Sequence, residues 1–363
     1  MRKKAIKIFA LMIAMMMVFA SCGENEVNEE SPVTENNEVV NEPIKKETRP
    51  ERIKLGSQHI VGLNSDGTVV DAGYDFPSEN NVENWTDIIE IATGSFFTAG
   101  LRSDGTVALL EYNYESDLQK VTEWKDIERI YSSNERIVGL KSDGTVVASP
   151  LNEYEEGEVK IWKDIVDIAV CDNNIAGLKS DGTVVSSGLS PMGRDELKDW
   201  ENIKAVAVGN YHVIGLKNDG TVVATSLLES TFDYGQCEVS DWTDIVKINT
   251  NFLFTIGLKS DGTVVSTQIN NEYQDIGQCE VSDWTDIVDI YSTRYYTIGL
   301  KSDGTVVSTG SDIIDECEES DWTDIVEIST GDDFIAGRKS DGTVVIAGSM
   351  NEDLLSASDW KLF

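Results

Sequence analysis

The sequence predicts an all-β fold, a β-propeller of eight short three- to four-stranded blades, from three observations. A Ser or Asn followed by Asp-Gly-Thr-Val occurs eight times, eight tryptophans keep step with those turns, and helix signals are nearly absent after residue 50. Antiparallel units of about 40 residues that repeat many times close as blades around an axis. Seven blades with one irregular unit is the alternative.

Two residue types mark the repeat. Twenty residues separate each of the first seven tryptophans from the next turn glycine. A buried tryptophan covers about 150–250 Å², so we expect the tryptophans to be wedges between neighbouring blades. The residues with a predicted structural role are Trp85, Trp124, Trp162, Trp200, Trp242, Trp284, Trp322 and Trp360, and the turn glycines Gly67, Gly105, Gly144, Gly182, Gly220, Gly262, Gly304 and Gly342.

Each unit contains at least three predicted strands. The first follows the tryptophan and is β-branched, as in residues 245–248, with a length typical of strands. The second surrounds Gly-Leu and the third is Thr-Val-Val. The Ser-Asp-Gly between them is a hairpin signal, because Asp-Gly accepts the positive φ angles of a tight turn. A short fourth strand fits before the next tryptophan.

The chain ends predict how the ring closes. Residues 360–363 supply the opening of a unit and then stop, whereas the first unit starts at Ile53 without that opening. We therefore expect the C-terminal segment to pair with the first repeat and seal the ring, which leaves few exposed strand edges.

The N-terminus predicts export. Arg2, Lys3, Lys4 and Lys7 precede or interrupt an apolar run that ends in Phe19-Ala20-Ser21-Cys22, a pattern typical of a signal peptide. The cysteine resembles the lipobox cysteine of bacterial lipoproteins, which implies lipidation at Cys22; an ordinary signal peptide with a chance cysteine is the alternative. We predict a lipoprotein signal peptide at 1–21, an acidic disordered tether at 22–50 and the propeller at 51–363.

The charge limits the partners. The formal net charge is −36, and it becomes −40 once the four basic residues of the signal peptide are removed. So acidic a chain has no basic surface with which to bind nucleic acid or anionic lipid. We expect a monomer that contacts the membrane only through the lipid on Cys22, at the extracytoplasmic face of the bacterial cell membrane. Its expected partner is a protein with a basic surface.

Length changes locate the variable surface. Eighteen to 22 residues separate a turn glycine from the following tryptophan, so all variation falls between the third strand and the next unit. Loops tolerate such changes and strands do not. These segments and the loops between first and second strands collect aromatic residues, which are common interface anchors. The candidate partner-binding residues are Tyr74, Phe76, Tyr112, Tyr114, Tyr154, Phe232, Tyr234, Phe252, Tyr273, Arg294 and Tyr295. Packing onto their own blades is the alternative.

The histidines, cysteines and turn aspartates give no reason to expect a catalytic residue, a metal or a cofactor. His59 and His212 share a repeat position that elsewhere holds Phe97, Phe254, Tyr296 or Phe334, which indicates packing. Three cysteines, Cys237, Cys279 and Cys317, each lie five residues before a tryptophan on successive blades, too far apart to form a disulfide. The turn aspartates form no calcium-binding Asp-x-Asp-x-Asp loop.

The units resemble the regulator of chromosome condensation repeat in its short bacterial form. The resemblance rests on Gly209-Asn210-Tyr211-His212 before Gly215-Leu216, on Asp219-Gly220-Thr221-Val222, and on Gly235-Gln236-Cys237 ahead of Trp242. It covers residues 51–363 and implies a β-propeller. The family includes a guanine-nucleotide exchange factor that binds chromatin and a secreted bacterial propeller that inhibits β-lactamases. The second is more similar in repeat length and export, but the loops that inhibit are not matched here.

We therefore expect a non-catalytic, lipid-anchored protein that binds another protein with one loop face of the propeller. One alternative is a module that binds glycan or cell-wall polymer through its tyrosines. The other is a propeller hydrolase or lyase, which would need carboxyl groups with raised pKa values converging in the central channel.

Overall fold

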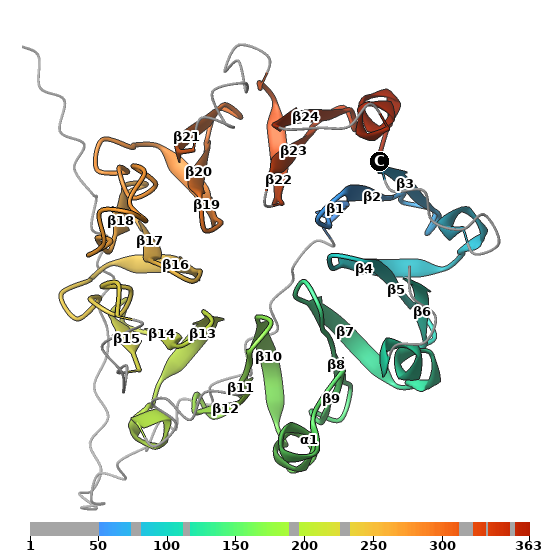
Figure 1. Cartoon of the computed structure of the whole chain (residues 1–363), viewed down its shortest axis with the longest axis horizontal. Helices are drawn as coiled ribbons and strands as arrows, with labels where there is room; N and C mark the ends of the chain where they lie inside the picture. The colour runs from blue at the N-terminus through green and yellow to red at the C-terminus, as the bar shows by residue number, and fades with distance from the viewer. Residues whose placement is uncertain are drawn as a thin grey trace, which may run out of the picture. The chain divides into compact units, whose positions relative to one another are not determined.

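The structure, a computed structural model, describes residues 51–73, 81–111, 117–188, 196–225, 233–311, 322–331, 333–348 and 353–363. All of these belong to one compact unit, residues 44–363. Among them, no helix is long and apolar enough to cross a membrane. Eight three-stranded antiparallel sheets are arranged around a common centre (Figure 1). The prediction of eight blades is confirmed, and the seven-bladed alternative is wrong.

Each blade consists of an inner, a middle and an outer strand, in chain order (Figure 1). Blades 1 to 4 are β1 (Ile53–Leu55), β2 (His59–Leu63) and β3 (Val69–Gly73); β4 (Ile88–Thr93), β5 (Phe97–Arg102) and β6 (Val107–Glu111); β7 (Ile127–Ser132), β8 (Ile137–Lys141) and β9 (Val146–Ser149); β10 (Ile165–Val170), β11 (Asn174–Lys179) and β12 (Val184–Gly188).

Blades 5 to 8 repeat the same order. They are β13 (Ile203–Val208), β14 (Val213–Lys217) and β15 (Val222–Ala224); β16 (Ile245–Thr250), β17 (Thr255–Lys259) and β18 (Val264–Ser266); β19 (Ile287–Ser292), β20 (Tyr296–Lys301) and β21 (Val306–Gly310); β22 (Ile325–Thr330), β23 (Phe334–Lys339) and β24 (Val344–Gly348).

The strand register separates two ends of every blade. In blade 2, Thr93 pairs with Thr98 and Phe97 with Glu111, so the loop between inner and middle strands and the end of the outer strand lie together. We call this end the loop face. The Asp-Gly turn joins β5 to β6 at the opposite end, which we call the turn face. Both ends of the described chain, before Ile53 and after Leu362, lie at the turn face, because Ile53 pairs with Gly62 and Leu362 bonds to the turn glycine Gly342.

The Asp-Gly turns connect neighbouring blades. The carbonyl of Gly67 in blade 1 accepts a hydrogen bond at 3.1 Å from the amide of Ile88, where the next blade begins. Gly67 has a φ of 82°, and a Cβ there would lie 3.2 Å from the Cα of Asp87. The turn thus needs glycine for its conformation and for the close approach of the next blade. The same bond recurs as Ile127–Gly105, Ile165–Gly144, Ile203–Gly182, Ile245–Gly220, Ile287–Gly262, Ile325–Gly304 and Leu362–Gly342.

The tryptophans pack against a glycine of the middle strand. A Cβ on Gly100 would lie 2.9 Å from Cε3 of Trp85, so only glycine leaves room for the indole ring. The remaining pairs are Trp124–Gly139, Trp162–Gly177, Trp200–Gly215, Trp242–Gly257, Trp284–Gly299, Trp322–Gly337 and Trp360–Gly62.

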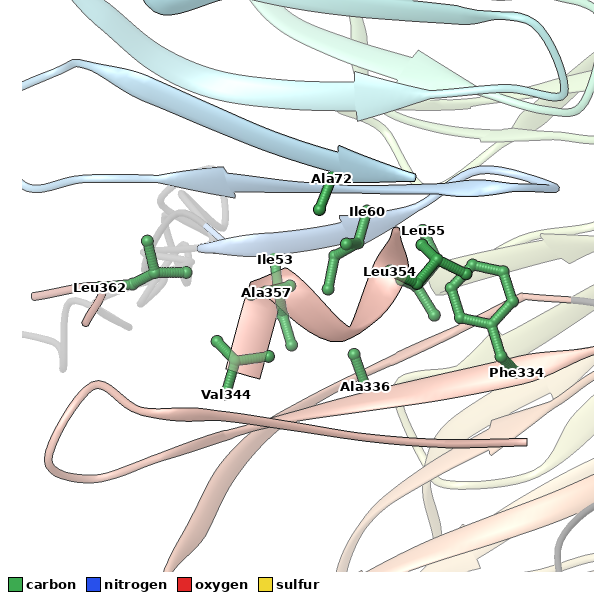
Figure 2. Close-up of a cluster of buried hydrophobic side chains, with 10 residues drawn as sticks. All are labelled: Ile53, Leu55, Ile60, Ala72, Phe334, Ala336, Val344, Leu354, Ala357 and Leu362. Atoms are coloured by element: carbon green, nitrogen blue, oxygen red, sulfur yellow. The ribbon is translucent and has the colours of Figure 1, made fainter. Parts of the chain in front are cut away.

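The last of these pairs closes the ring, as predicted. Trp360 and Leu362 come from the C-terminus, but they pack on Gly62 of blade 1. Leu362 takes the place of the isoleucine that begins each of blades 2 to 8. Lys361 forms a β-bridge with Thr343. Figure 2 shows the apolar cluster at this closure: Ile53, Leu55, Ile60 and Ala72 of blade 1 with Phe334, Ala336, Val344, Leu354, Ala357 and Leu362.

Where a fourth strand was allowed for, the described connections before blades 6 and 7 contain only turns, and five other described connections form helical elements. These are η1 (Val82–Asn84), η2 (Asp117–Glu123), α1 (Glu153–Val159), η3 (Glu196–Asp199) and η6 (Leu354–Asp359). The residue three before the tryptophan is buried in each, and its carbonyl accepts from the tryptophan amide, as with Val82 and Trp85 at 2.8 Å. The described blades therefore have three strands, and the connection before the tryptophan contributes a buried apolar side chain in place of a fourth strand.

Candidate partner-binding face

The loop face rests on a row of buried side chains, one per blade, eight residues before the turn glycine. The row is His59, Phe97, Arg136, Asn174, His212, Phe254, Tyr296 and Phe334, and none of them is more than 7 % exposed. The two histidines hydrogen-bond to threonine hydroxyls, His59 to Thr98 at 3.1 Å and His212 to Thr250 at 2.7 Å. Burial lowers the pKa of both imidazoles to about 4, so they are neutral near pH 7.

Polar members of this row bond to the loop of the next blade. Asn174 donates to the carbonyls of Gly209 and Asn210, at 3.0 and 2.7 Å, and the hydroxyl of Tyr296 donates to the carbonyl of Gly331. These bonds hold neighbouring loops at fixed positions. The backbone that carries the exposed side chains of these loops is therefore held in place.

Two buried glutamines hold the long connections that precede blades 6 and 7. The side-chain oxygen of Gln236 accepts from the amide of Tyr234 at 2.7 Å, and that of Gln278 accepts from Ile276 at 2.7 Å. Each glutamine's backbone carbonyl accepts from a threonine of the following blade, Thr255 or Thr297. These connections are thus ordered by buried hydrogen bonds even though they carry the four-residue insertions.

An aromatic cluster spans the loops of blades 5 and 6. The ring centroids of Tyr211 and Phe252 are 5.4 Å apart in an edge-to-face arrangement, and those of Tyr234 and Phe252 are 5.6 Å apart. All three rings are half-buried, and Tyr234 and Phe252 also pack on the core of blade 6. Part of the surface of these rings is therefore buried against the fold.

Blade 7 extends this cluster with a cation. The guanidinium of Arg294 lies 5.1 Å from the ring centroid of Phe252 and 5.7 Å from that of Tyr295. Its Nη2 donates to the side-chain oxygen of Gln274 at 2.9 Å, which fixes its orientation. Tyr295 is 40 % exposed. We call Tyr211, Tyr234, Phe252, Arg294 and Tyr295 the aromatic patch.

The candidate residues of the sequence analysis divide into three groups. Tyr234, Phe252, Arg294 and Tyr295 come together in the aromatic patch, and Tyr273, 86 % exposed, precedes Gln274, which bonds to Arg294. Tyr74, Phe76, Tyr112, Tyr114, Phe232 and Cys22, as well as the side chain of Tyr154, lie outside the described residues. Sequence reasoning did not select Gln236, Gln274 or Gln278; the repeated Gly-Gln-Cys-Glu-Val was a signal for two of them.

The inner strands bring charged side chains together around the centre. A propeller hydrolase or lyase would need its reactive carboxyl groups there. Burial raises the pKa of Glu90, opposed by the charge of Arg129. Both of its oxygens bond to the next blade, to Arg129 Nε at 3.3 Å and to the amide of Ile130 at 3.1 Å. Asp167 accepts from the Tyr131 hydroxyl at 3.0 Å, and Asp289 pairs with Lys247. These carboxylates join adjacent blades through hydrogen bonds and ion pairs.

The turn aspartates and the cysteines have local explanations. In all eight turns the aspartate Oδ1 accepts from the backbone amide and the hydroxyl of the threonine two residues later, as Asp104 does from Thr106 at 2.9 and 2.6 Å. The described cysteines, Cys171, Cys237 and Cys279, are free, and burial raises the pKa of Cys237 to about 12. Among the described residues, no group of three or more His, Cys, Asp and Glu is placed to hold a metal ion.

The eight three-stranded blades, the hydrogen bonds and packing between neighbouring blades, and the closure of the ring together define an eight-bladed β-propeller. No family model and no curated protein matches the sequence. Among solved structures, the CRINKLY WD40 ectodomain of the Arabidopsis thaliana receptor kinase ACR4 superposes with a TM-score of 0.51 at 14 % identity, over 84 % of this chain and 96 % of that one.

Two further solved structures align. The ectodomain of the Physcomitrella patens receptor kinase CR4 gives a TM-score of 0.52 at 14 % identity over 72 % of each chain. Yeast RCC1 (Prp20), in a structure with Kap60, gives 0.45 at 16 % identity over 85 % of this chain and 82 % of that one. Neighbours thus include propellers of the regulator of chromosome condensation type. At these identities the likeness shows the fold alone.

Proposed function

We propose that this protein is a non-catalytic binding protein that recognises another protein with the loop face of blades 5 to 7. The observation that supports this most directly is the aromatic patch, in which tyrosines, a phenylalanine and an arginine from three blades meet on rigid loops. Tyrosine and arginine are frequent in the few interface residues that dominate binding energy. A pre-ordered surface also loses little conformational entropy on binding.

The packing within the patch favours a protein over a glycan. Sugar rings stack on open aromatic faces, but Phe252 is covered by Tyr211, Tyr234 and Arg294. Arg294 and Tyr295 are exposed, whereas Tyr211, Tyr234 and Phe252 are half-buried. Such a mixed, uneven surface fits side chains of a protein partner better than a flat sugar.

The proposal includes attachment by lipid at Cys22, as a lipoprotein with short repeats of the regulator of chromosome condensation type. The mature protein would be a monomer held at the extracytoplasmic face of the cell membrane, with no catalytic role. The two ends of the described part of the chain lie at the turn face, opposite the loop face. Replacing Cys22 with Ser should abolish incorporation of labelled palmitate and release the protein from the membrane fraction. Unchanged labelling would contradict the lipid anchor.

The binding role is tested by photocrosslinking of the full chain in intact cells. A photoreactive phenylalanine analogue replaces Tyr295 on the loop face or, as a control, Val246, which is similarly exposed at 49 % but is the second residue of inner strand β16, near the turn face. We expect a discrete crosslinked protein band from position 295 and none from 246. Equal bands from both positions, or no band from 295, would overturn the proposal.

A further inference from the structure

The aromatic patch has acidic surroundings. Asp233 precedes Tyr234, while Glu272 and Asp275 flank the Tyr273-Gln274 pair whose Gln274 holds Arg294, and all three carboxylates are exposed. The two connections that carry them lie side by side, because the amide of Asn270 donates to the carbonyl of Tyr234 at 2.8 Å. Residues 233–241 and 268–284 contain no lysine, arginine or histidine.

Two of these carboxylates are fixed in place. Asp233 accepts from the amide of Gly235 and Asp275 from the amide of Gly277, each at 3.0 Å. One oxygen of each side chain is used in the turn, and the charge stays at the edge of the patch. Ordered charges at a rim steer association and select the sign of the partner's charge.

Arg294 is the cation within the patch, and it does not require an acidic partner. Its guanidinium is stacked on Phe252 and donates one described hydrogen bond, to Gln274. Arginine has five N–H donors. Arg294 is exposed, so its other N–H groups can donate to backbone carbonyls, which every protein segment presents.

Building on the proposed function, we propose that the aromatic patch takes a segment of the partner in which an apolar side chain is flanked by lysine or arginine. The apolar side chain packs against Tyr211, Tyr295 and the accessible edge of Phe252. The flanking cations lie opposite Asp233, Glu272 and Asp275, and Arg294 donates to the segment's backbone. The net charge of the whole chain, −36, adds a long-range attraction for a positively charged partner.

Three synthetic peptides of equal length test this inference with the full chain in detergent solution. They share a central Phe-Leu pair and carry lysine, glutamine or glutamate at the flanking positions. We expect the lysine peptide to bind at least about tenfold more tightly than the glutamine peptide at low salt, and most of that difference to vanish near 0.5 M salt because of screening. The glutamate peptide should bind most weakly.

Matched variants separate local from overall charge. The rim variant combines Asp233→Asn, Glu272→Gln and Asp275→Asn, and asparagine keeps the acceptor for Gly235 and Gly277. The control combines Asp104→Asn, Asp143→Asn and Asp181→Asn, which removes the same charge at the turn face, where asparagine still accepts from the threonines. The rim variant should weaken lysine-peptide binding about tenfold, and the control should change it less than about twofold.

Several outcomes would overturn the inference: equal affinity for the three peptides, binding of none, or equal weakening by both variants. None of these affects the crosslink expected at position 295. The binding role and the charge of its partner can therefore fail separately.

Discussion

Trp360, three residues from the C-terminus, packs against Gly62 in the first blade, so that a Cβ at position 62 would lie 3.0 Å from the indole Cε3. The same contact joins Trp200 to Gly215 in the middle of the chain. The final contact thus repeats an ordinary blade-to-blade wedge, but it joins chain segments almost 300 residues apart. The ring is held shut by the same packing that stacks its blades.

Replacing Trp360 with Ala should lower the free energy of unfolding by at most about 3–5 kcal/mol, the cost of removing a fully buried large aromatic side chain, because Trp360 is half-buried. Urea denaturation measures the loss. Trp200→Ala is the control and should cost at least as much, since Trp200 is buried, but only Trp360→Ala should let protease cleave the ends of the folded protein first. Equal protease resistance of the two variants would show that the ring does not depend on Trp360 for closure.

Gly220→Ala should destabilise the protein by at least about 1–2 kcal/mol, because an L-residue at a φ of 84° is strained. The new Cβ would also lie 3.3 Å from Asp244 of the next blade. Gly157→Ala is the matched control: it lies in α1, and a Cβ there meets no atom within 4 Å. This control should be neutral or stabilise by up to about 1 kcal/mol. Thermal unfolding of both variants measures the two changes in stability.

His212→Phe should reduce the loss of stability at acid pH. Burial lowers the pKa of His212 from 6.5 to about 4, so between these values the unfolded chain binds more protons than the folded protein. Stability is therefore complete above pH 6.5 and declines as the pH falls toward 4. The substitution should remove about 2 kcal/mol of the decline between pH 7 and 5.

Chemical denaturation at several pH values measures this effect. His59→Phe should behave alike, since burial lowers the pKa of His59 to about 4 as well. Phenylalanine occupies the same position in blades 2, 6 and 8, so the fold accommodates it. An unchanged slope with pH in both variants would show that the two imidazoles are not neutral in the folded protein.

Glu155→Ala should cost about 3–5 kcal/mol, because it leaves the charge of Arg136 buried without compensation. The two side chains form an ion pair at 3.2 Å, and both are buried. The double variant Arg136→Phe, Glu155→Ala should recover most of that loss, since Arg136 occupies a position held by phenylalanine elsewhere. A double variant no more stable than Glu155→Ala, by urea denaturation, would contradict this account.

The repeat made most of the fold predictable. The turn glycines set the number of blades, and the lone Trp360 at the C-terminus predicted the closure. Other recurring positions were visible but not interpreted: an apolar residue three before seven of the eight tryptophans, and an aspartate two after six of them. That aspartate adopts a φ near 60°, as in Asp87 and Asp244, and asparagine takes its place at Asn202; only the backbone explains why short polar residues recur there.

The sequence by itself determined the number of blades, the turns and the closing segment, because each depends on residues at constant spacing and on local conformation. The tertiary structure decided which aromatic residues meet. Tyr211, Phe252 and Arg294 lie on separate blades about 40 residues apart, and their contacts depend on the angle between blades and on loops held by Asn174, Gln236 and Gln278. Such contacts join residues from different repeats, so no spacing within one unit reveals them.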